Sequence, residues 1–451
     1  ANLGAYLTML GPHSPTNNLG TLAGPYTTPA IYTHVTGVFT NTGSTGPYRG
    51  AGRPEAAYAI ERAIDTAAAE MGIDPAEIRR RNYIAPNAMP YKTGLVFTYD
   101  SGEFEANMNG AMTIADYAGF AQRRAEANAR GKLRGIGMSN VIEQSAGGPP
   151  EWAQIRFDPS GAATLVMGTH NHGQGHETVF RQILADKLGL EFEQVRLQQG
   201  DSDSVSAGTG TWGSRTSGVG GASIGLAAER VIDKCRKVAA HTLEAAEEDI
   251  EFDDGRFTVA GTDRTMTLID AAKMVQNFMT APPGMEVGLS EWAAWSPPAP
   301  TFPNGCHICE VEIDRETGTL EIVRYVAVDD VGTVINPLLM EGQLHGGIAQ
   351  GVGQIALENV AWDHDSGQLV SASFMDYAMP RADDLPSFEL GINEVPTLTN
   401  PMGVKGAGEA GCVGAMPALM NAIVDALRPL GVATIDMPAT PERLWRAMRQ
   451  A

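Results

Sequence analysis

A stretch near the carboxyl end of the chain places one carboxylate among small residues. Glu409 follows Gly406 and Gly408 and precedes Gly411. Such residues let the backbone approach a bulky ligand closely, and the apolar residues that follow predict a buried helix. Partial burial raises the pKa of a carboxyl group, so we expect Glu409 to act as a general base with a raised pKa. The alternative is a solvated glutamate in a turn.

The same residues match a dinucleotide-binding fingerprint, Gly406-x-Gly408-x-x-Gly411. That fingerprint needs a preceding strand and an acidic residue about 20 positions later, at the end of a second strand. Pro401 interrupts the approach to the loop, and Asp425 falls inside the predicted helix. The sequence therefore disfavours a dinucleotide-binding fold at this point.

Two further Gly-rich loops, residues 168–177 and 208–218, each precede a predicted helix. The free N–H groups at a helix N-terminus favour an anion such as a phosphate or pyrophosphate, while ordinary helix capping is the alternative. The first loop also holds His170, His172 and His176, which invite a zinc-hydrolase reading. Their spacing matches neither HExxH nor paired CxxC, and the surrounding glycines favour backbone contact with a ligand.

A fourth Gly-rich loop, residues 43–53, carries Arg49 directly before a helix that Pro54 begins. Proline suits the first position of a helix because its missing N–H is not needed there. Arg49 is therefore placed either to hold an anion or to lie at the surface as a solvated cation. The residues alone do not separate these two alternatives.

The elements that must position these loops follow from hydrophobic period, caps and turns. We expect helices that begin near residues 54, 75, 114, 177, 221, 337, 410 and 441. We expect strands over residues 31–39, 133–143, 152–157, 163–167, 194–199, 305–314 and 320–325. The pair Cys306 and Cys309 lies in one of these strands with its members on opposite faces, so we treat it as core sequence. The mixture indicates an α+β fold with mixed sheets and long helices.

The composition of the chain excludes some classes of partner and indicates a compartment. The chain has 451 residues, of which 43% are hydrophobic, enough for two or more domains. A net charge of -21 argues against nucleic acid and anionic membrane as partners. We see no apolar run near membrane length and no signal-like start. Four cysteines form no disulfide framework, which favours a reducing compartment and a cytoplasmic location.

Taken in order, the loops resemble those of the molybdenum hydroxylases, the xanthine dehydrogenase, aldehyde oxidase and carbon monoxide dehydrogenase family. The segments that carry the resemblance are residues 47–53, 172–178, 213–216, 342–347, 403–409 and 438–442. The resemblance implies molybdopterin-binding domains of the large subunit. It assigns residues 1–135 to the remainder of a first such domain and 136–451 to a second, whose two αβ subdomains meet near 292–303.

The resemblance also implies roles for individual residues. Glu409 resembles the catalytic base, Arg49 the arginine beside the metal, and Gln343 the glutamine near the molybdenum. The implied cofactor contacts are Gly50, Ala51, Gly173, Gln174, Gly175, His176, Gly213, Ser214, Arg215, Thr216, Gln343, Lys405 and Gly406. No side chain is expected to bind the metal, which the pterin dithiolene would hold. The implied reaction hydroxylates an N-heteroaromatic ring or oxidises an aldehyde with oxygen from water.

The resemblance implies partners as well. Molybdopterin is expected as its cytosine dinucleotide, with 2Fe-2S clusters on a small subunit and FAD on a medium subunit. An N-terminal half or a companion molybdopterin subunit is expected to complete the site. The alternative is a non-catalytic cofactor-binding or assembly subunit.

Two positions depart from named branches of the family. Aerobic carbon monoxide dehydrogenases carry a copper-binding cysteine where Gly50 stands, so we do not expect oxidation of carbon monoxide. Xanthine-type enzymes place phenylalanine at the position of Ala51. The smaller side chain leaves room for a different or larger substrate.

Overall fold

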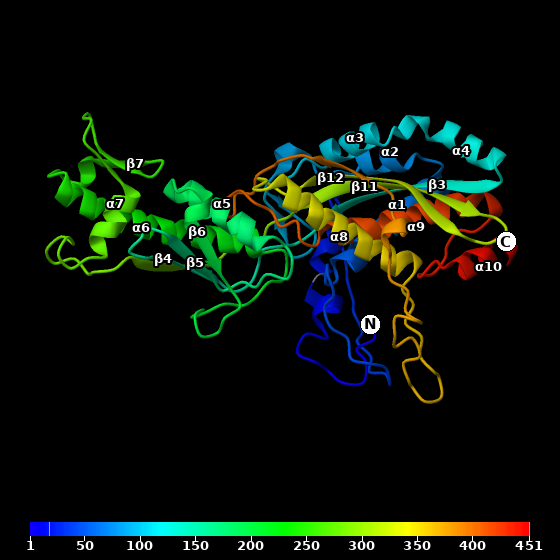
Figure 1. The fold of residues 1–451 in the computed structure, drawn as a ribbon. Helices are drawn as coiled ribbons and strands as arrows, with labels where there is room; N and C mark the ends of the chain where they lie inside the picture. The colour runs from blue at the N-terminus through cyan, green and yellow to red at the C-terminus, as the bar shows by residue number, and fades with distance from the viewer. Residues whose placement is uncertain (18, 451) are drawn as a thin grey trace.

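The computed structural model describes residues 1–17 and 19–450, and these form two lobes joined side by side (Figure 1). The central lobe contains residues 1–142 and 304–450, and the inserted lobe contains residues 151–295. The α+β class is confirmed, because each lobe combines a mixed four-stranded sheet with helices.

The sheet of the central lobe has the order β13-β12-β11-β3. Its strands are β3 (Lys132–Ile142), β11 (Asn304–Asp314), β12 (Leu320–Asp330) and β13 (Phe388–Ile392). The neighbours of β11 are antiparallel to it, whereas β13 runs parallel to β12. The expected hairpin before and after Gly318 is confirmed and is longer than its sequence pattern indicated.

Helices cover both faces of this sheet (Figure 1). One face is covered by α3 (Phe104–Ile114) and α4 (Phe120–Ala129), and the other by α9 (Ala410–Leu427). Two further helices, α1 (Arg53–Met71) and α8 (Pro337–Ala356), pack on α9. The remaining helices of this lobe are α2 (Pro75–Arg80) and α10 (Pro441–Gln450). The helices expected at residues 54, 75, 337, 410 and 441 are thus confirmed.

The helix expected over residues 114–129 is confirmed over Phe120–Ala129, as α4 after a short 3-10 turn, but its start is wrong, and α3 before it was missed. Asp116 has a positive φ of 45°, a left-handed conformation that ends a helix. Arg123 then donates to the main-chain oxygens of Ala115 and Asp116, at 3.1 and 2.9 Å. The break between α3 and α4 is therefore built around an arginine that lies further along the chain.

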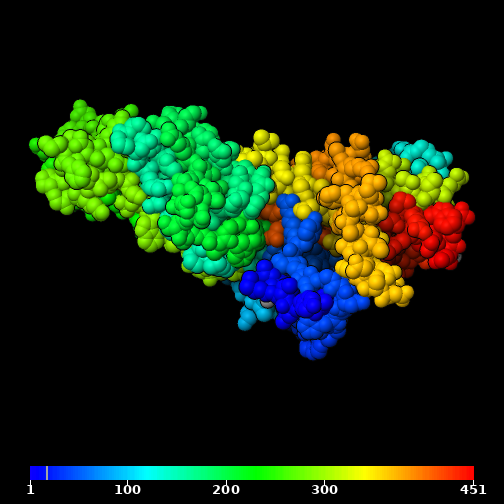
Figure 2. All heavy atoms as spheres, turned by 60° about the horizontal axis from the view of Figure 1, so that its bottom comes forward, coloured from blue at the N-terminus to red at the C-terminus, as the bar shows by residue number. Residues whose placement is uncertain are grey.

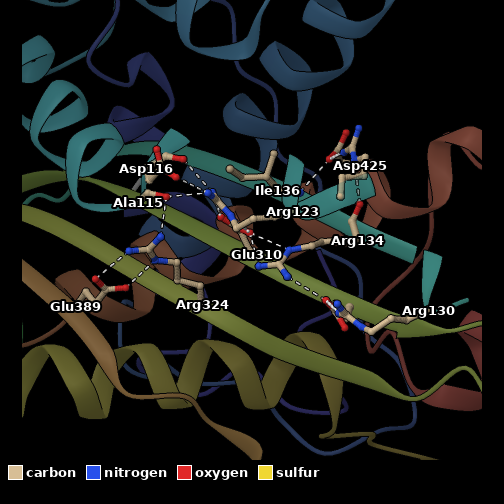
Figure 3. Close-up of polar contacts among 12 residues, drawn as sticks. Ala115, Asp116, Arg123, Arg130, Arg134, Ile136, Glu310, Arg324, Glu389 and Asp425 are labelled. Atoms are coloured by element: carbon tan, nitrogen blue, oxygen red, sulfur yellow. Dashed lines mark hydrogen bonds and ion pairs between the residues drawn. The ribbon is translucent and has the colours of Figure 1, made fainter. Parts of the chain in front are cut away.

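An ion-pair layer fastens α3 and α4 to the sheet (Figure 3). Glu310 on β11 is buried and lies between Arg123 of α4, at 2.6 Å, and Arg134 of β3, at 2.7 Å. Arg324 of β12 reaches the main-chain oxygen of Ala115 at 2.9 Å. Buried carboxylates need such partners, and here they fix the helical layer over the sheet.

The inserted lobe has a second sheet of order β10-β4-β5-β6. Its strands are β4 (Glu151–Phe157), β5 (Ala163–Met167), β6 (Val195–Gln198) and β10 (Ser290–Trp295), covered by α5 (His176–Leu188) and α6 (Gly221–Thr242). A small sheet of β7 (Ile250–Asp253), β8 (Arg256–Val259) and β9 (Thr265–Thr267) lies beyond, with α7 (Leu268–Val275). The strands and helices expected for residues 152–242 are confirmed.

Two segments carry the chain between the lobes, residues 143–150 and 296–303. They pair with each other, because Ser145 and Thr301 exchange two main-chain hydrogen bonds of 2.9 Å and their hydroxyls lie 2.7 Å apart. The second segment lies at the expected subdomain junction. The domain division after residue 135 stays a prediction, and β3 runs across that point.

Residues 1–50 and 357–387 are mostly irregular and lie side by side below the sheet (Figures 1 and 2). A Cβ on Gly43 would lie 3.5 Å from Trp362, which shows the contact between them. The strand expected over residues 31–39 is wrong, because that segment has no strand beside it and forms only an isolated bridge from Val38 to Asn2. A strand without neighbours leaves its backbone groups unpaired. A short hairpin, β1 (Tyr91–Lys92) and β2 (Thr98–Tyr99), lies nearby.

The stretch Ala410–Leu430 is long and apolar enough for a membrane span by length and composition, which the sequence analysis did not expect of any segment. Almost all of it is buried inside the protein, against β3, β11 and α8. A helix that is apolar all round and enclosed in this way belongs to the core of a large domain.

Candidate functional site

A cleft of about 1350 Å³ lies where the two lobes meet. Its walls come from the N-terminal segment, the crossing segment 143–150, two loops of the inserted lobe, α8 with the residues before it, and the loop before α9. Four helices, α1, α5, α8 and α9, begin next to it, so their N-terminal ends surround the same space. Figure 2 shows the N-terminal segment (blue) and the segment near residue 400 (orange) beside the inserted lobe (green).

Glu409 lies at the start of α9 and lines this cleft. Its Oε1 accepts a hydrogen bond from the Gly50 N–H at 2.9 Å. Its Oε2 accepts from Arg53 at 2.5 Å and from the Ser214 hydroxyl at 2.8 Å. The side chain is 12% exposed. Glu409 is therefore a nearly buried carboxylate with three donors, and the solvated-turn alternative is wrong.

The expected direction of the Glu409 pKa is also wrong. Burial raises it, but Arg53, the Gly50 N–H and Ser214 together lower it below the ordinary value. An adjacent positive charge and hydrogen bonds to a carboxylate both favour its charged form. Glu409 is consequently ionised, and so able to take a proton, across the neutral pH range.

A second carboxyl group, Glu143, lies behind Glu409 and was not singled out from the sequence. Its Oε1 is 2.8 Å from the Ser214 hydroxyl and 3.6 Å from Arg53, and the side chain is 1% exposed. Burial raises the pKa of Glu143 well above its ordinary value, and Glu409 raises it further, although Arg53 opposes both. The available signal was a glutamate directly after the apolar residues Val141 and Ile142 of β3.

Arg49 lines the cleft and forms hydrogen bonds with neutral partners only. It donates to the Gly408 main-chain oxygen at 2.6 Å, to the Gln350 side chain at 2.9 Å, and to the Gln343 main-chain and side-chain oxygens at 3.0 and 3.2 Å. No described carboxylate forms an ion pair with it. Arg49 thus brings an uncompensated positive charge to the same wall as Gln343 and Glu409, and the solvated-surface alternative is wrong.

The two loops of the inserted lobe reach the cleft largely through backbone and small polar groups. Gly173, Gln174, His176, Gly213, Ser214 and Thr216 line it, as do Ala51 and Gly406. A Cβ on Gly173 or on Gly213 would meet nothing within 4 Å, so both backbones face open space. The Thr216 hydroxyl is buried without a partner among the described residues. Burial lowers the pKa of His176 to about 4, which leaves that imidazole neutral.

Gly50 and Gly175 are near the cleft but do not line it. Gly50 directs its N–H at Glu409. Gly175, with φ +80°, precedes α5, and a Cβ there would lie 2.6 Å from Leu339. Both glycines shape the loops around the cleft.

Arg215 and Lys405 do not offer their charges to a ligand as the sequence analysis expected. The Arg215 guanidinium is buried and pairs with Glu151 at 2.8 Å. The Lys405 ammonium is buried and pairs with Asp330 at 2.5 Å. Both charges are neutralised inside the protein, although the Arg215 Nε has no hydrogen-bond partner among the described residues.

No group of three or more His, Cys, Asp or Glu side chains is arranged to hold a metal ion in the part of the chain that the structure describes. His170 and His172 stack at 4.4 Å, whereas His176 turns toward Phe180 and Gln199. The zinc-hydrolase alternative therefore has no support in the geometry. Cys306 and Cys309 are buried in the sheet, as expected of core sequence.

Comparison with known proteins identifies relatives of this chain. Family models described as molybdopterin cofactor-binding domains match residues 1–83 and 111–386. The carbon monoxide dehydrogenase large chain of Hydrogenophaga pseudoflava is 37% identical over 95% of this chain and 55% of its own length. The nicotine 6-hydroxylase large subunit of Paenarthrobacter nicotinovorans is 36% identical over 95% of this chain and 54% of its own.

Solved structures agree with these relatives. Quinoline 2-oxidoreductase from Pseudomonas putida 86 superposes with a TM-score of 0.94 at 36% identity, covering all of this chain and 59% of that one. The Cu,Mo-CO dehydrogenase gives 0.93 at 35% identity, with the same coverage. The chain thus spans about half the length of the curated relatives it matches.

Proposed function

The chain belongs to the molybdopterin-binding large subunits of the molybdenum hydroxylases, and from this premise we propose that it carries the catalytic base of such an enzyme. The observation that carries the proposal is the meeting of Glu409, Arg49 and Gln343 on one wall of a cleft between the lobes. We propose a reaction that hydroxylates an N-heteroaromatic ring or oxidises an aldehyde, with oxygen from water.

The chemistry of the cleft fits molybdopterin. Exposed glycine backbone at Gly173 and Gly213 leaves room for a bulky ring system, and the unpartnered Thr216 hydroxyl offers a hydrogen bond. We propose that these residues, with Gln174 and Ser214, would hold the pterin of molybdopterin in its cytosine dinucleotide form. When bound, the molybdenum cofactor supplies the two-electron redox centre and the Lewis acid of the reaction.

Glu409 has the properties required of the base. Two donors occupy its Oε2, whereas Oε1 accepts only the Gly50 N–H. A carboxylate oxygen can accept more than one hydrogen bond, so Oε1 is the atom that takes the proton as oxygen is transferred to the substrate. Arg49 then stabilises negative charge that develops on the substrate, because its charge has no carboxylate partner.

Residues 50 and 51 support a ring or aldehyde substrate in preference to carbon monoxide. Gly50 has no side chain, and no cysteine lines the cleft among the described residues. A copper ion of the kind named in the Cu,Mo-CO dehydrogenase would require a soft thiolate ligand. Ala51 lines the cleft with a single methyl group, which leaves room in the cleft for a bulkier substrate such as a planar ring.

The proposed partners follow from what this chain lacks and exposes. Its four cysteines are buried and separate, so iron–sulfur clusters would have to sit on a small subunit and FAD on a medium subunit. Exposed apolar side chains occur on both irregular segments: Met9, at 91%, lines the cleft on the N-terminal segment, and Phe374, at 83%, lies on the segment 357–387. Such a surface is typical of an interface, and we propose that the other half of the large subunit covers it in the cytoplasm.

The test is Glu409→Gln in the assembled complex. Glutamine keeps the size of the side chain and cannot act as a base, so turnover should fall by about 10²–10⁴-fold while the molybdenum content stays at the wild-type level. Glu442→Gln, an exposed change on α10, is the matched control and should leave both unchanged. Undiminished turnover in Glu409→Gln would support the assembly-subunit alternative and reject the proposal.

A further inference from the structure

Four polar residues form a cluster at the wall of the cleft: Arg53, Ser214 and Glu409 line it, and Glu143 lies behind them. We infer that Glu143 is a neutral carboxylic acid which, through the Ser214 hydroxyl, positions Glu409 as the carboxylate of the pair. Glu143 is thus a positioning residue, and its role rests on the proposed function of Glu409 as base.

The hydroxyl of Ser214 makes the assignment necessary. It lies 2.8 Å from Oε1 of Glu143 and 2.8 Å from Oε2 of Glu409. A serine hydroxyl has one proton to donate and two lone pairs that accept. It can donate to only one of the two carboxyl groups, so the other must donate to it, and a carboxyl group donates only when protonated.

Charge leads to the same result. The cluster contains one arginine and two carboxyl groups, and their side chains are between 1% and 12% exposed. Two carboxylates against a single guanidinium would leave one negative charge buried without compensation, which is costly. One proton shared within the pair makes the cluster neutral.

The surroundings decide which carboxyl group holds that proton. Glu409 receives the Gly50 N–H, the close Arg53 contact of 2.5 Å and the Ser214 hydroxyl. Glu143 lies 3.6 Å from Arg53, and its Oε2 has no partner among the described residues. An unpaired buried oxygen is far less costly on a neutral acid than on a carboxylate. The raised pKa of Glu143 and the lowered pKa of Glu409 agree with this order.

Ser214 is held so that its hydroxyl cannot turn away easily. Its φ is +51°, a left-handed conformation that is unusual for a residue with a side chain. A Cβ on Gly406 would lie 1.9 Å from the Ser214 main-chain oxygen, so the loop before Glu409 packs directly on it. This packing holds the backbone of Ser214, and with it the hydroxyl that bridges Glu143 and Glu409, in place, while Oε1 of Glu409 accepts only the Gly50 N–H.

The first test measures protonation without requiring turnover. Infrared spectra of the full complex at pH 7 are recorded for the wild type, Glu143→Gln and Glu312→Gln. The carbonyl band of a protonated carboxyl group should be lost in Glu143→Gln. It should stay in Glu312→Gln, because that buried glutamate pairs with Arg134 at 2.9 Å. A protonated-carboxyl band that is unchanged in Glu143→Gln would overturn the inference.

The second test uses kcat/KM. The amide of Glu143→Gln still donates to Ser214, so kcat/KM should stay within about threefold of wild type, whereas Glu143→Leu removes the donor and should lower it about tenfold or more. An equal loss of kcat/KM in the two variants, with molybdenum still bound, would show that a hydrogen-bond donor at position 143 is not needed, and would overturn the inference. Failure of the proposed function is separate, because it would appear as undiminished turnover in Glu409→Gln whatever the infrared result.

Discussion

Glu409 owes its properties to residues that are distant in the sequence. Arg53 and Gly50 come from the start of α1, and Ser214 comes from the inserted lobe. The sequence interpretation considered burial alone and expected a raised pKa. In the structure, a close guanidinium and two further donors outweigh burial.

The lowered pKa of Glu409 predicts a pH dependence with a definite sign. A group whose pKa is lowered by folding contributes stability above its unfolded pKa and loses it as the pH falls through the folded value. The acid limb of kcat/KM should therefore lie below the ordinary glutamate value of 4.5. Arg53→Gln removes the main lowering cause and should move that limb to higher pH.

The pH–rate profile of both proteins, measured with metal content as a control, checks this prediction. An acid limb at the same pH in Arg53→Gln and wild type would contradict it.

The pH dependence of stability that Glu143 contributes has the opposite sign, because the pKa of Glu143 is raised. Its contribution to stability is complete at low pH and is lost as the pH rises through its folded pKa, which lies above 4.5.

At the scale of elements, α9 positions Glu409 because it packs directly on β3. A Cβ on Gly137 of β3 would lie 2.2 Å from the main-chain oxygen of Ala418 and 2.2 Å from the nitrogen of Ala422. Only glycine permits this close approach of strand and helix. The small residues of β3 are therefore part of how the base is held.

Gly137→Ala should push α9 away from β3 and lower the free energy of unfolding by about 1–3 kcal/mol, as overpacking does. Because Glu409 begins α9, kcat should fall too. Gly225→Ala is the matched control, since nothing lies within 4 Å of a Cβ there. That change should leave stability equal or raise it by up to about 1 kcal/mol. Thermal unfolding of both variants checks the pair, and equal stabilities would contradict the packing argument.

The loop before α9 is fastened to the sheet by the buried pair of Lys405 and Asp330. Asp330 also accepts from the Gly332 N–H at 2.9 Å and from Asn304 at 3.0 Å. Lys405→Met would leave this carboxylate buried without its cation, at a cost of about 3–5 kcal/mol. The melting temperature should fall clearly, whereas Arg446→Met, at an exposed pair on α10, should cost at most about 1 kcal/mol. A small effect of Lys405→Met on stability with loss of the cofactor would instead favour direct cofactor contact.

At the scale of the whole molecule, the two lobes are held together next to the cleft by their paired crossing segments. The Ser145 and Thr301 hydroxyls are buried and 2.7 Å apart, and Ser145 also accepts the Gly406 N–H at 3.2 Å. This contact links both crossings to the loop that carries Glu409. The distance between the lobes, and with it the width of the cleft, depends on these bonds.

A double-mutant cycle with Ser145→Ala and Thr301→Val should show a coupling of about 0.5–1.5 kcal/mol in the free energy of unfolding. The same cycle applied to cofactor content should show coupling of the same sign, because a wider cleft loses contacts from both walls. Urea unfolding and molybdenum analysis of the four proteins check it. Additive effects in both measurements would mean that Ser145 and Thr301 are not coupled, which would contradict the prediction.

The sequence by itself determined most elements and the loops between them. The period of apolar residues predicted α1, α5, α6, α8 and α9, and the hairpin of β11 and β12, because these patterns depend on neighbours a few residues apart. The residue pattern singled out Glu409, whereas Arg49 and Gln343 were joined to it only by the resemblance to the molybdenum hydroxylases. The sequence interpretation failed over residues 31–39, which have no neighbouring strand among the described residues, and at the start of the helix near residue 114, where Arg123 binds the main-chain oxygens of Ala115 and Asp116.

Only the tertiary structure decided which charges are free to act. Arg215 and Lys405 look like ligand-binding cations in the sequence, yet Glu151 and Asp330 neutralise them inside the protein. Glu143 looks like the end of a strand, yet it shares a hydroxyl with a residue 266 positions later in the chain, since the bridge runs from Glu143 through Ser214 to Glu409. The reason is physical: the ionisation of a buried group depends on the partners that folding brings within a few ångströms, and local spacing along the chain does not encode them.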